Sequence, residues 1–512
     1  MKRLILLFFA ALLALHSLAQ TPADVRAKVR QYRQQHEVQI LRDFRDLLAI
    51  PNLASDTTNI QRNAEYIAAA LQKRGVRTQL LTVPGAPPLI YGELPAPGAK
   101  HTLIFYAHYD GQPVDPAQWK NPPWSPTLRS GKLEDGAPEV SFDSLQPPVN
   151  GEWFLYARSA GDDKAPIAAM TAALDALAAS GVQRTINLKF FLEGEEEAGS
   201  PHFADAIKKY AELLKGDAWL LCDGPVHQTR RMQVFFGARG VTDAEITLYG
   251  PARSLHSGHY GNWAPNPAVL AADLISSMRD TNAHILIPGY YDDVRPLTAS
   301  EKQAIAAIPD ADTQMKKELG LAWTESSGES LPMAITHPAL NIRGVDVGHV
   351  GDKAQNAVPT EAHISVDFRL VPDETPGRVR ELVEHFLRQK GYNIVRETPD
   401  IETRRTHPRV AKVAWGPGYP AARTNMDLPA ARAMVGAIED TLGGPIVQMP
   451  MLGGSVPMYL FLDVLHTPVV GVPIANHDDN QHAANENLRV QNLWDGIEVF
   501  AGILTGTEAR WK

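Results

Sequence analysis

Four carboxylates stand within five residues directly after an apolar segment of the sequence. The run from Ile186 to Leu192 is typical of a buried strand, and it is followed by Glu193, Glu195, Glu196 and Glu197. Like charges packed this closely at the edge of a core are costly unless a cation shares their field. Taken alone, this stretch could equally be a solvated acidic loop. The rest of the sequence distinguishes such a loop from a cation site.

Histidine and acidic side chains also follow other predicted strands, or open the helices after them. The full set is His108, Asp110, Asp162, Glu196, Glu197, Asp223 and His482. In open α/β sheets, ligands bind outside the carboxyl ends of the strands. Imidazole and carboxylate donors together suit Zn²⁺ or a similar borderline ion. The sequence therefore predicts a metal site at one edge of a sheet.

The charges of these donors favour two ions rather than one. Asp162, Glu197 and Asp223 supply three negative charges. The neutral imidazoles of His108 and His482 supply none, and two dications would supply four positive charges. The surplus of about one positive charge would hold a bridging hydroxide at neutral pH.

The elements that must position these residues alternate between strands and helices, which predicts an α/β sheet with crossover helices. The predicted strands before residue 223 are Thr78–Val83, Leu89–Glu93, Thr102–Ala107, Trp153–Ala157, Ile186–Leu192 and Ala218–Cys222. The predicted helices are Pro22–Ile50, Asn59–Arg74, Asp162–Ser180 and Ala204–Leu214. Gln112–Pro148 is rich in proline and lacks a helical period, so we predict an irregular surface segment there.

The pattern changes near Val241, where apolar and polar residues begin to alternate, as in strands with one wet face. With predicted helices at Pro267–Arg279 and Pro376–Lys390, residues 236–419 are predicted to form a separate α+β insert. The α/β pattern resumes with a helix at Leu428–Leu442 and a strand at Pro468–Ile474. Residues 20–235 and 420–512 are therefore predicted to form one catalytic domain.

The first residues have the pattern of a secretory signal peptide. Lys2 and Arg3 precede a Leu/Phe/Ala-rich core, and Ser17-Leu18-Ala19 resembles a cleavage site. We therefore expect cleavage near Ala19 and an exported protein, either periplasmic or secreted. The apolar core is too short for a membrane span, and no later segment is long and apolar enough.

The overall charge argues against nucleic acid as a partner. The formal net charge is −9, and it becomes −11 when Lys2 and Arg3 leave with the signal peptide. The sequence has no cluster of lysine and arginine residues that would bind the phosphates of a nucleic acid. The single cysteine, Cys222, excludes an internal disulfide, so stability must come from a large apolar core.

Eight short motifs occur in the order typical of the co-catalytic zinc exopeptidases. They are His108-Tyr109-Asp110 with Gln112-Pro113-Val114, Asp162-Asp163-Lys164-Ala165-Pro166, Glu193 to Ser200, Cys222-Asp223, Leu255-His256-Ser257-Gly258, Arg369-Leu370-Val371-Pro372, Gly453-Gly454-Ser455-Val456-Pro457 and His482. The sequence resembles this family, which includes carnosinase, the cytosolic nonspecific dipeptidase, carboxypeptidase G and the aminoacylases. The carnosinase-type dipeptidase branch is the most similar, and eight motifs in one order make chance a poor explanation.

The resemblance implies how the metal ligands are shared. Asp162 resembles the carboxylate that bridges two metal ions. His108 and Asp223 resemble ligands of one ion, and Glu197 and His482 resemble ligands of the other. The residues alone would also allow His477, and the family spacing favours His482. The implied cofactor is a pair of divalent ions, which we expect to be Zn²⁺, although Mn²⁺ or Co²⁺ could serve.

The resemblance also implies catalytic roles. Glu196 resembles the general base that takes a proton from water and returns it to the leaving amine. Asp110 resembles the carboxylate that fixes the tautomer of His108. His256 resembles a histidine that reaches the oxyanion from the other subunit of a dimer. Arg369 resembles the arginine that binds the terminal carboxylate of the substrate.

Ser455 and Gly454 resemble contacts to the backbone of the substrate. The chain departs from the family where glycine is common, because it has Ala157, Ser159 and Ala165 there. Glycine allows unusual backbone angles, and the family often has a cis peptide after the bridging aspartate. These substitutions affect the local backbone and leave the ligand in place. The segment 133–152 is longer than usual and would reshape the rim of the site.

The predicted fold is an α/β, zinc-exopeptidase-like mixed sheet flanked by helices, with an inserted ferredoxin-like lid and dimerisation domain. The predicted function is an exported homodimeric exopeptidase that hydrolyses dipeptides or short peptides with a free C-terminal carboxylate. An N-acyl-amino-acid deacylase with the same metals is the nearest alternative, and a non-catalytic binding protein on the same fold is a second. A serine hydrolase is disfavoured because no G-x-S-x-G elbow follows a strand.

Overall fold

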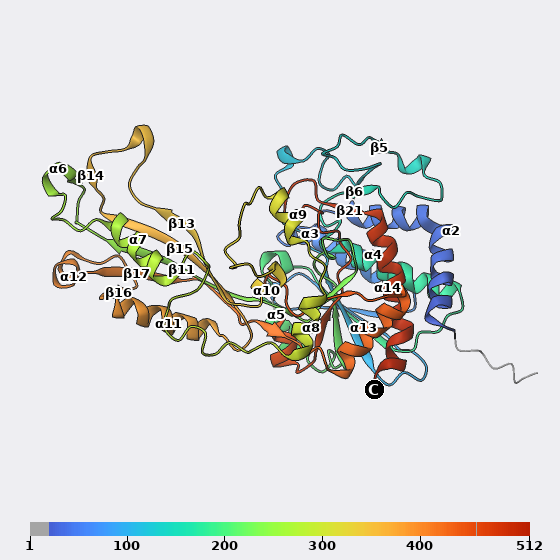
Figure 1. The fold of residues 1–512 in the computed structure, drawn as a ribbon. Helices are drawn as coiled ribbons and strands as arrows, with labels where there is room; N and C mark the ends of the chain where they lie inside the picture. The colour runs from blue at the N-terminus through green and yellow to red at the C-terminus, as the bar shows by residue number, and fades with distance from the viewer. Residues whose placement is uncertain (1–19, 457) are drawn as a thin grey trace, which may run out of the picture.

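The computed structural model of the chain describes residues 20–456 and 458–512. Figure 1 shows a body of helices around a central sheet, with an elongated extension on one side of it. The predicted signal peptide, Met1–Ala19, lies outside the described residues. Within the described ranges, none of the helices combines the length and the apolar character that a membrane crossing requires.

The central sheet of the body has eight strands. They are β1 (Arg77–Leu81), β2 (Leu89–Leu94), β3 (Thr102–His108), β7 (Asn187–Glu193), β8 (Ala218–Leu221), β9 (Gln233–Phe235), β19 (Val447–Met449) and β20 (Val469–Gly471), in the order β1-β2-β7-β3-β8-β20-β9-β19. The central strands β7, β3, β8 and β20 are parallel, whereas β2 pairs antiparallel with β1 and β7. The sheet is therefore mixed, as predicted, and the carboxyl ends of β3, β7 and β8 meet at one edge.

Helices cover both faces of this sheet because alternate residues of β3 point to opposite sides. Leu103 and Phe105 belong to one apolar cluster, and Ile104 and Tyr106 belong to another. The first cluster includes side chains of α2 (Pro22–Leu48), α3 (Thr57–Gln72), α4 (Lys164–Ala179), α13 (Pro429–Leu442) and α14 (Val490–Arg510). The second includes α5 (Phe203–Lys209) and a π-helical turn at Leu460–Val464.

A small antiparallel sheet covers the top of the body in Figure 1. It contains β4 (Thr127–Arg129), β5 (Glu139–Val140), β6 (Phe154–Tyr156) and β21 (Asn487–Arg489), in the order β21-β6-β4-β5. The prediction that Gln112–Pro148 is wholly irregular is therefore wrong, because β4 and β5 lie in it. Leu128 of β4 is fully buried and pairs with Leu155 of β6. Strands of two or three residues are too short to show a period.

The extension is built on a five-stranded sheet with its own apolar core. The strands are β11 (Gly240–Tyr249), β13 (Ala339–Asp346), β15 (Glu361–Leu370), β16 (Asn393–Val395) and β17 (Val410–Trp415), in the order β13-β15-β11-β17-β16. Helices α7 (Pro267–Met278) and α11 (Pro376–Gln389) pack on it. The smaller elements are α6 (Ser257–Tyr260), α12 (Ile401–Thr406), β12 (Leu255–His256) and β14 (Ala357–Val358), with β10 (Gly237–Ala238) pairing β18 (Ala422–Arg423) beside the body.

One segment between α7 and β13 lies against the body rather than in the extension (Figure 1). It contains α8 (Ala299–Ala307), α9 (Asp312–Glu318) and α10 (Leu331–Ala334). Glu301 of α8 forms a buried ion pair with Arg423, with Oε1 and Nε 2.9 Å apart. The middle segment of the predicted insert therefore packs beside the central sheet, while its other strands and helices form the extension.

Candidate metal centre

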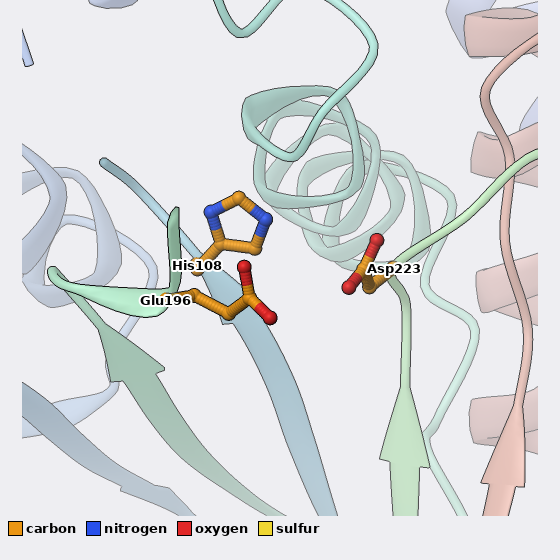
Figure 2. Close-up of side chains that lie close together, drawn as sticks. All are labelled: His108, Glu196 and Asp223. Atoms are coloured by element: carbon orange, nitrogen blue, oxygen red, sulfur yellow. The ribbon is translucent and has the colours of Figure 1, made fainter. Parts of the chain in front are cut away.

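Three of the predicted site residues face one another at the carboxyl ends of parallel strands. His108 is the last residue of β3, Asp223 comes just after β8, and Glu196 lies in the turn after β7 (Figure 2). A nitrogen of His108 and carboxylate oxygens of Glu196 and Asp223 all lie within 4.8 Å of one another. The parallel arrangement of these strands brings the three side chains together.

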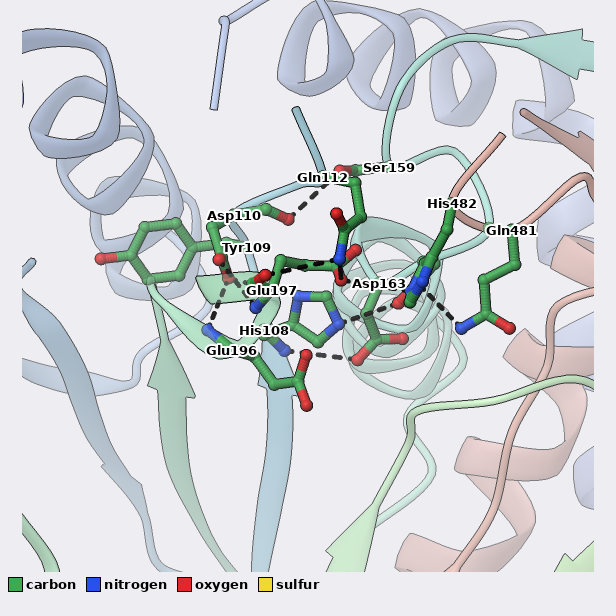
Figure 3. Close-up of polar contacts among 12 residues, drawn as sticks. His108, Tyr109, Asp110, Gln112, Ser159, Asp163, Glu196, Glu197, Gln481 and His482 are labelled. Carbon is green, nitrogen blue, oxygen red and sulfur yellow. Dashed lines mark hydrogen bonds and ion pairs between the residues drawn. The ribbon is translucent and has the colours of Figure 1, made fainter. Parts of the chain in front are cut away.

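A second group of donors shares His108. Its Nε2 lies 2.8 Å from Oδ1 of Asp162, and ligand atoms of His108, Asp162 and Glu197 lie within 4.8 Å of one another. His482 Nε2 lies 3.2 Å from Asp162 Oδ2 and 3.2 Å from Glu197 Oε2. Figure 3 shows His108, Glu197 and His482 in this group. Together with Asp223, the structure places all five predicted metal ligands around one point.

Asp110 contacts both the histidine and the acidic turn. Its Oδ1 lies 3.3 Å from Nδ1 of His108, although the geometry is not that of a hydrogen bond. Its two oxygens also accept the backbone N–H groups of Glu196 at 3.1 Å and Glu197 at 3.0 Å. Asp110 therefore links the end of β3 to the turn after β7, a contact that the sequence did not reveal.

The acidic groups of the site carry more negative charge than their surroundings neutralise. Burial raises the pKa of Glu196 well above its ordinary range. Burial, and then the charge of Asp162, raise the pKa of Asp223 to about 7. Hydrogen bonds to Asp162 and Glu197 raise the pKa of His482 to about 10. Several buried carboxylates lie close together here, and each makes ionisation of the others less favourable. A cation would remove this repulsion, so this set of carboxylates and histidines fits divalent metal ions.

The loop that carries Asp162 is held by one buried carboxylate. Glu486 Oε1 accepts the backbone N–H groups of Gly161 and Asp162, both at 3.0 Å. Its Oε2 accepts the N–H of Ser159 at 2.9 Å and Nη1 of Arg158 at 2.7 Å. Sequence reasoning missed this role, although Glu486 follows His482 by four residues.

The backbone of this loop has the unusual conformation that the family resemblance implies. The peptide bond between Asp162 and Asp163 is cis. Ser159 has a φ of 62°, in the left-handed region that favours glycine. Ser159 thus adopts a conformation in which glycine is the commoner residue.

Two glutamines complete the polar contacts of the ligands (Figure 3). Gln112 Nε2 donates to Glu197 Oε2 at 2.7 Å, and Gln481 Nε2 donates to Asp162 Oδ2 at 2.7 Å. Sequence reasoning assigned neither side chain. Their positions beside the motifs of Asp110 and His482 were the only available signal.

The predicted substrate residues divide between the cleft and the far end of the extension. Gly454 and Ser455 line a cavity of about 430 Å³ together with Asp162, Glu196 and Asp223. Arg369 Nη1 donates to Ser455 Oγ at 2.8 Å. His256, by contrast, lies beside α6 and β14 at the outer end of the extension (Figure 1), so its own chain does not bring it to the cluster.

A family model described as peptidase family M20/M25/M40 matches residues 104–506. The chain belongs to this family. It is therefore a metallopeptidase, and the resemblance derived from the motifs is confirmed. One solved M20 family protein of similar fold, YXEP of Bacillus subtilis, is described as a dinuclear metal binding peptidase.

Relatives of this M20 peptidase are similar along nearly their whole length. Cys-Gly metallodipeptidase dug1 of Schizosaccharomyces pombe is 25% identical over 471 residues, which cover 88% of this chain and 92% of the relative. Beta-Ala-His dipeptidase of Homo sapiens is 26% identical over 504 residues, covering 94% and 92%. The solved M20 family metallo-carboxypeptidase Sso-CP2 of Sulfolobus solfataricus has a TM-score of 0.73 at 27% identity, covering 92% of this chain and 99% of that one.

The comparisons contradict one prediction about this M20 peptidase, namely its export. The fungal Dug1 dipeptidases, which align along nearly the whole chain, are cytosolic enzymes. The prediction depended only on the charges and apolar residues before Ala19, which lie outside the described residues. Short apolar N-terminal segments carry little information per residue, so this signal was weaker than the motifs. Export is not part of the function proposed below.

Proposed function

We propose that this M20 peptidase is a two-metal exopeptidase that hydrolyses dipeptides or short peptides with a free C-terminal carboxylate. The main support is the convergence of five metal-ligand candidates with the carboxylate of Glu196 facing them. The relatives named as dipeptidases support the substrate class.

In this proposal the metal ligands divide as the motifs imply. His108 and Asp223 would hold one ion, Glu197 and His482 would hold the other, and Asp162 would be shared. We propose Zn²⁺ as the native metal, with Mn²⁺ or Co²⁺ as substitutes. When bound, such ions polarise the scissile carbonyl and lower the pKa of water.

Glu196 is proposed to move the proton during hydrolysis. Its carboxylate lines the cleft, and burial raises its pKa above the ordinary range. It would take the proton of the attacking water and deliver it to the amine that leaves, while Asp110 keeps both His108 and the turn of Glu196 in position.

Arg369, Ser455 and Gly454 are proposed to bind the carboxylate end and the backbone of the substrate, because they line or adjoin the same cleft. His256 is proposed to stabilise the oxyanion in the other subunit of a homodimer. Residues 236–419 are proposed as the lid and dimerisation domain, and residues 20–235 and 420–512 as the catalytic domain.

Surface features of the extension support a dimer. β13 is an edge strand of the five-stranded sheet, and an edge with free N–H and C=O groups can pair with another chain. Large apolar side chains are exposed in residues 236–419, namely Trp263, Val269, Val345 and Val350. Exposed apolar side chains of this size are typical of an interface rather than of a free surface.

The test is a substrate panel with the metal-free protein reloaded with Zn²⁺, Mn²⁺ or Co²⁺. We expect hydrolysis of dipeptides, and loss of activity after chelation. Acetylated and succinylated amino acids in the same panel test the deacylase alternative. Hydrolysis of the acylated amino acids alone would contradict the proposal.

A further inference from the structure

Arg239 is a partly buried arginine whose positive charge is not paired with a carboxylate within the described residues. It lies between β10 and β11, where the chain passes from the body to the extension. Its Nε donates to the carbonyl oxygen of Gly453 at 3.2 Å. In residues 20–456 and 458–512 this is its only hydrogen bond, and it forms no ion pair there. Two nitrogens of its guanidinium are thus available to a ligand.

The neighbouring Arg369 is more fully occupied. Its Nε lies 3.2 Å from Asp367 Oδ2, and its Nη1 donates to Ser455. Asp367 is thus paired with Arg369 rather than with Arg239. Burial, and then the charge of Arg369, lower the pKa of Arg239 to about 10. Two arginines that repel each other beside a substrate cleft, with one carboxylate between them, favour binding of an anion.

Arg239 also lines a second cavity, of about 840 Å³, which adjoins the metal cleft. The two cavities share Pro225, Leu452 and Gly453 in their walls. The volume lies in the range of small-molecule sites. Its wall includes apolar side chains of the segment that packs against the body, among them Ile305, Met315, Leu331 and Met333.

The acidic side chains of this cavity do not neutralise Arg239. Asp312 Oδ2 accepts the N–H of Leu331 at 2.9 Å, and Glu329 lies 3.3 Å from His337. Asp310 accepts the N–H of Asp312 at 2.9 Å. The free face of the arginine and the apolar wall therefore belong to one open space.

We propose that Arg239 is a second residue that binds the terminal carboxylate of the substrate, and that the cavity it lines receives the apolar side chain of the substrate's C-terminal residue. This inference rests on the proposed function, since it assumes a peptide substrate with a free carboxylate. A guanidinium with two free N–H donors suits a carboxylate, and the apolar wall suits a leucine or phenylalanine side chain.

The binding test uses metal-loaded Glu196→Gln protein, in which turnover is suppressed. The Kd values of Ala-Phe and of Ala-Phe amide are measured by calorimetry, with and without Arg239→Gln. We expect the second substitution to weaken Ala-Phe binding by about 10-fold to 100-fold, the usual range for a hydrogen-bonded charge, and to leave the amide unchanged. Arg231→Gln, which removes an exposed arginine before β9, is the control.

Equal weakening of both ligands, or no weakening, would overturn the assignment of Arg239. An Arg239→Lys variant guards against misfolding, because it keeps the charge and should bind Ala-Phe with intermediate affinity. Failure of the proposed function gives a different result: the wild-type protein would hydrolyse no dipeptide at all, whatever Arg239→Gln does.

The side-chain part of the inference is tested with active enzyme. Met333→Trp fills the cavity, so kcat/KM for Ala-Phe should fall at least about 10-fold, as expected when a buried apolar side chain loses its site. Ala-Gly, which has no side chain to place there, should be hydrolysed as by the wild type. If both substrates change equally, the cavity is not the subsite.

Discussion

Glu195 and Glu196 are adjacent in the sequence but lie in different surroundings. Glu196 faces His108 and Asp223, whereas Glu195 accepts from His202 at 2.9 Å. Of these two glutamates, Glu196 is the one that lines the cleft. We expect Glu196→Gln to lower kcat by about 10²-fold to 10⁴-fold, the usual contribution of a general base.

Glu195→Gln is the matched control, since it removes the same charge one residue away. Metal content, measured by atomic absorption, should stay unchanged in Glu196→Gln. Equal activity of Glu196→Gln and the wild type on the same dipeptide would contradict the role of this base.

Glu486 acts on the metal site through the backbone rather than by contact with a metal. Its carboxylate accepts three backbone N–H groups of the Asp162 loop, from Ser159, Gly161 and Asp162. Glu486→Gln offers an amide in place of one of these acceptor oxygens, so the loop should lose its position. We expect metal affinity, measured by chelator competition, to fall by about 10-fold to 100-fold, as for other residues behind metal ligands.

Glu486→Gln has a second effect, because it also leaves the buried charge of Arg158 without its ion-pair partner. The double variant Arg158→Met with Glu486→Gln removes both charges and separates the two effects. If the double variant binds metal as tightly as the wild type, Glu486 only balances the charge of Arg158.

The turn between β15 and α11 contains Glu374, whose carboxyl group is difficult to ionise. Glu374 Oε2 accepts the N–H of Val371 at 2.8 Å, while its Oε1 has no hydrogen-bond partner within residues 20–456 and 458–512. Burial is the main cause that raises its pKa from 4.5 to about 7. Between pH 4.5 and about pH 7, the Glu374 carboxyl is therefore protonated in the folded state and ionised in the unfolded state.

The sign of the effect on stability follows from this difference. Stability from Glu374 is fully present below pH 4.5 and is lost as the pH rises through about 7. Glu374→Gln stays neutral, so the variant should match the wild type at pH 5. At pH 8 it should be more stable by up to about 3 kcal/mol, at ~1.4 kcal/mol per pKa unit. Chemical denaturation at both pH values measures this, and parallel pH profiles would contradict it.

The long apolar runs of the sequence were enough to predict where the site residues lie. Ile186–Leu192 became β7, and Thr102–Ala107 became β3, because buried parallel strands are apolar on both faces. The strand ends then had to meet at one edge. Family motifs supplied the division of the ligands, which strand periodicity alone could not give.

Contacts between distant short segments could not be predicted. β4 and β5 have two or three residues each, and the docking of α8 depends on the pairing of Glu301 with Arg423. Arg239 was missed for a similar reason. Its importance comes from the absence of an acidic partner, which no sequence pattern reports.

For the whole molecule, metal removal should lower stability as well as activity. The carboxylates of Asp162, Glu197 and Asp223 converge at the centre of the body, and without cations they repel one another. Zn²⁺ at 100 times its Kd should stabilise the folded chain by about 2.7 kcal/mol for each site. Thermal unfolding in EDTA and after addition of Zn²⁺ measures this. An unchanged melting temperature would contradict a metal centre formed by these residues.

The position of His256 makes the proposed dimer testable by mixing two inactive variants. His256 lies at the outer end of the extension, away from the metal cluster of its own chain (Figure 1). Glu196→Gln and His256→Ala should each be inactive as homodimers. After dissociation and reassociation, half of the dimers should be mixed, and one of their two sites should combine an intact Glu196 with an intact His256. The mixture should therefore recover about a quarter of wild-type activity, as expected for random pairing in a two-fold dimer. Mixing without dissociation is the control, and a reassociated mixture without activity would mean that His256 does not act across the interface.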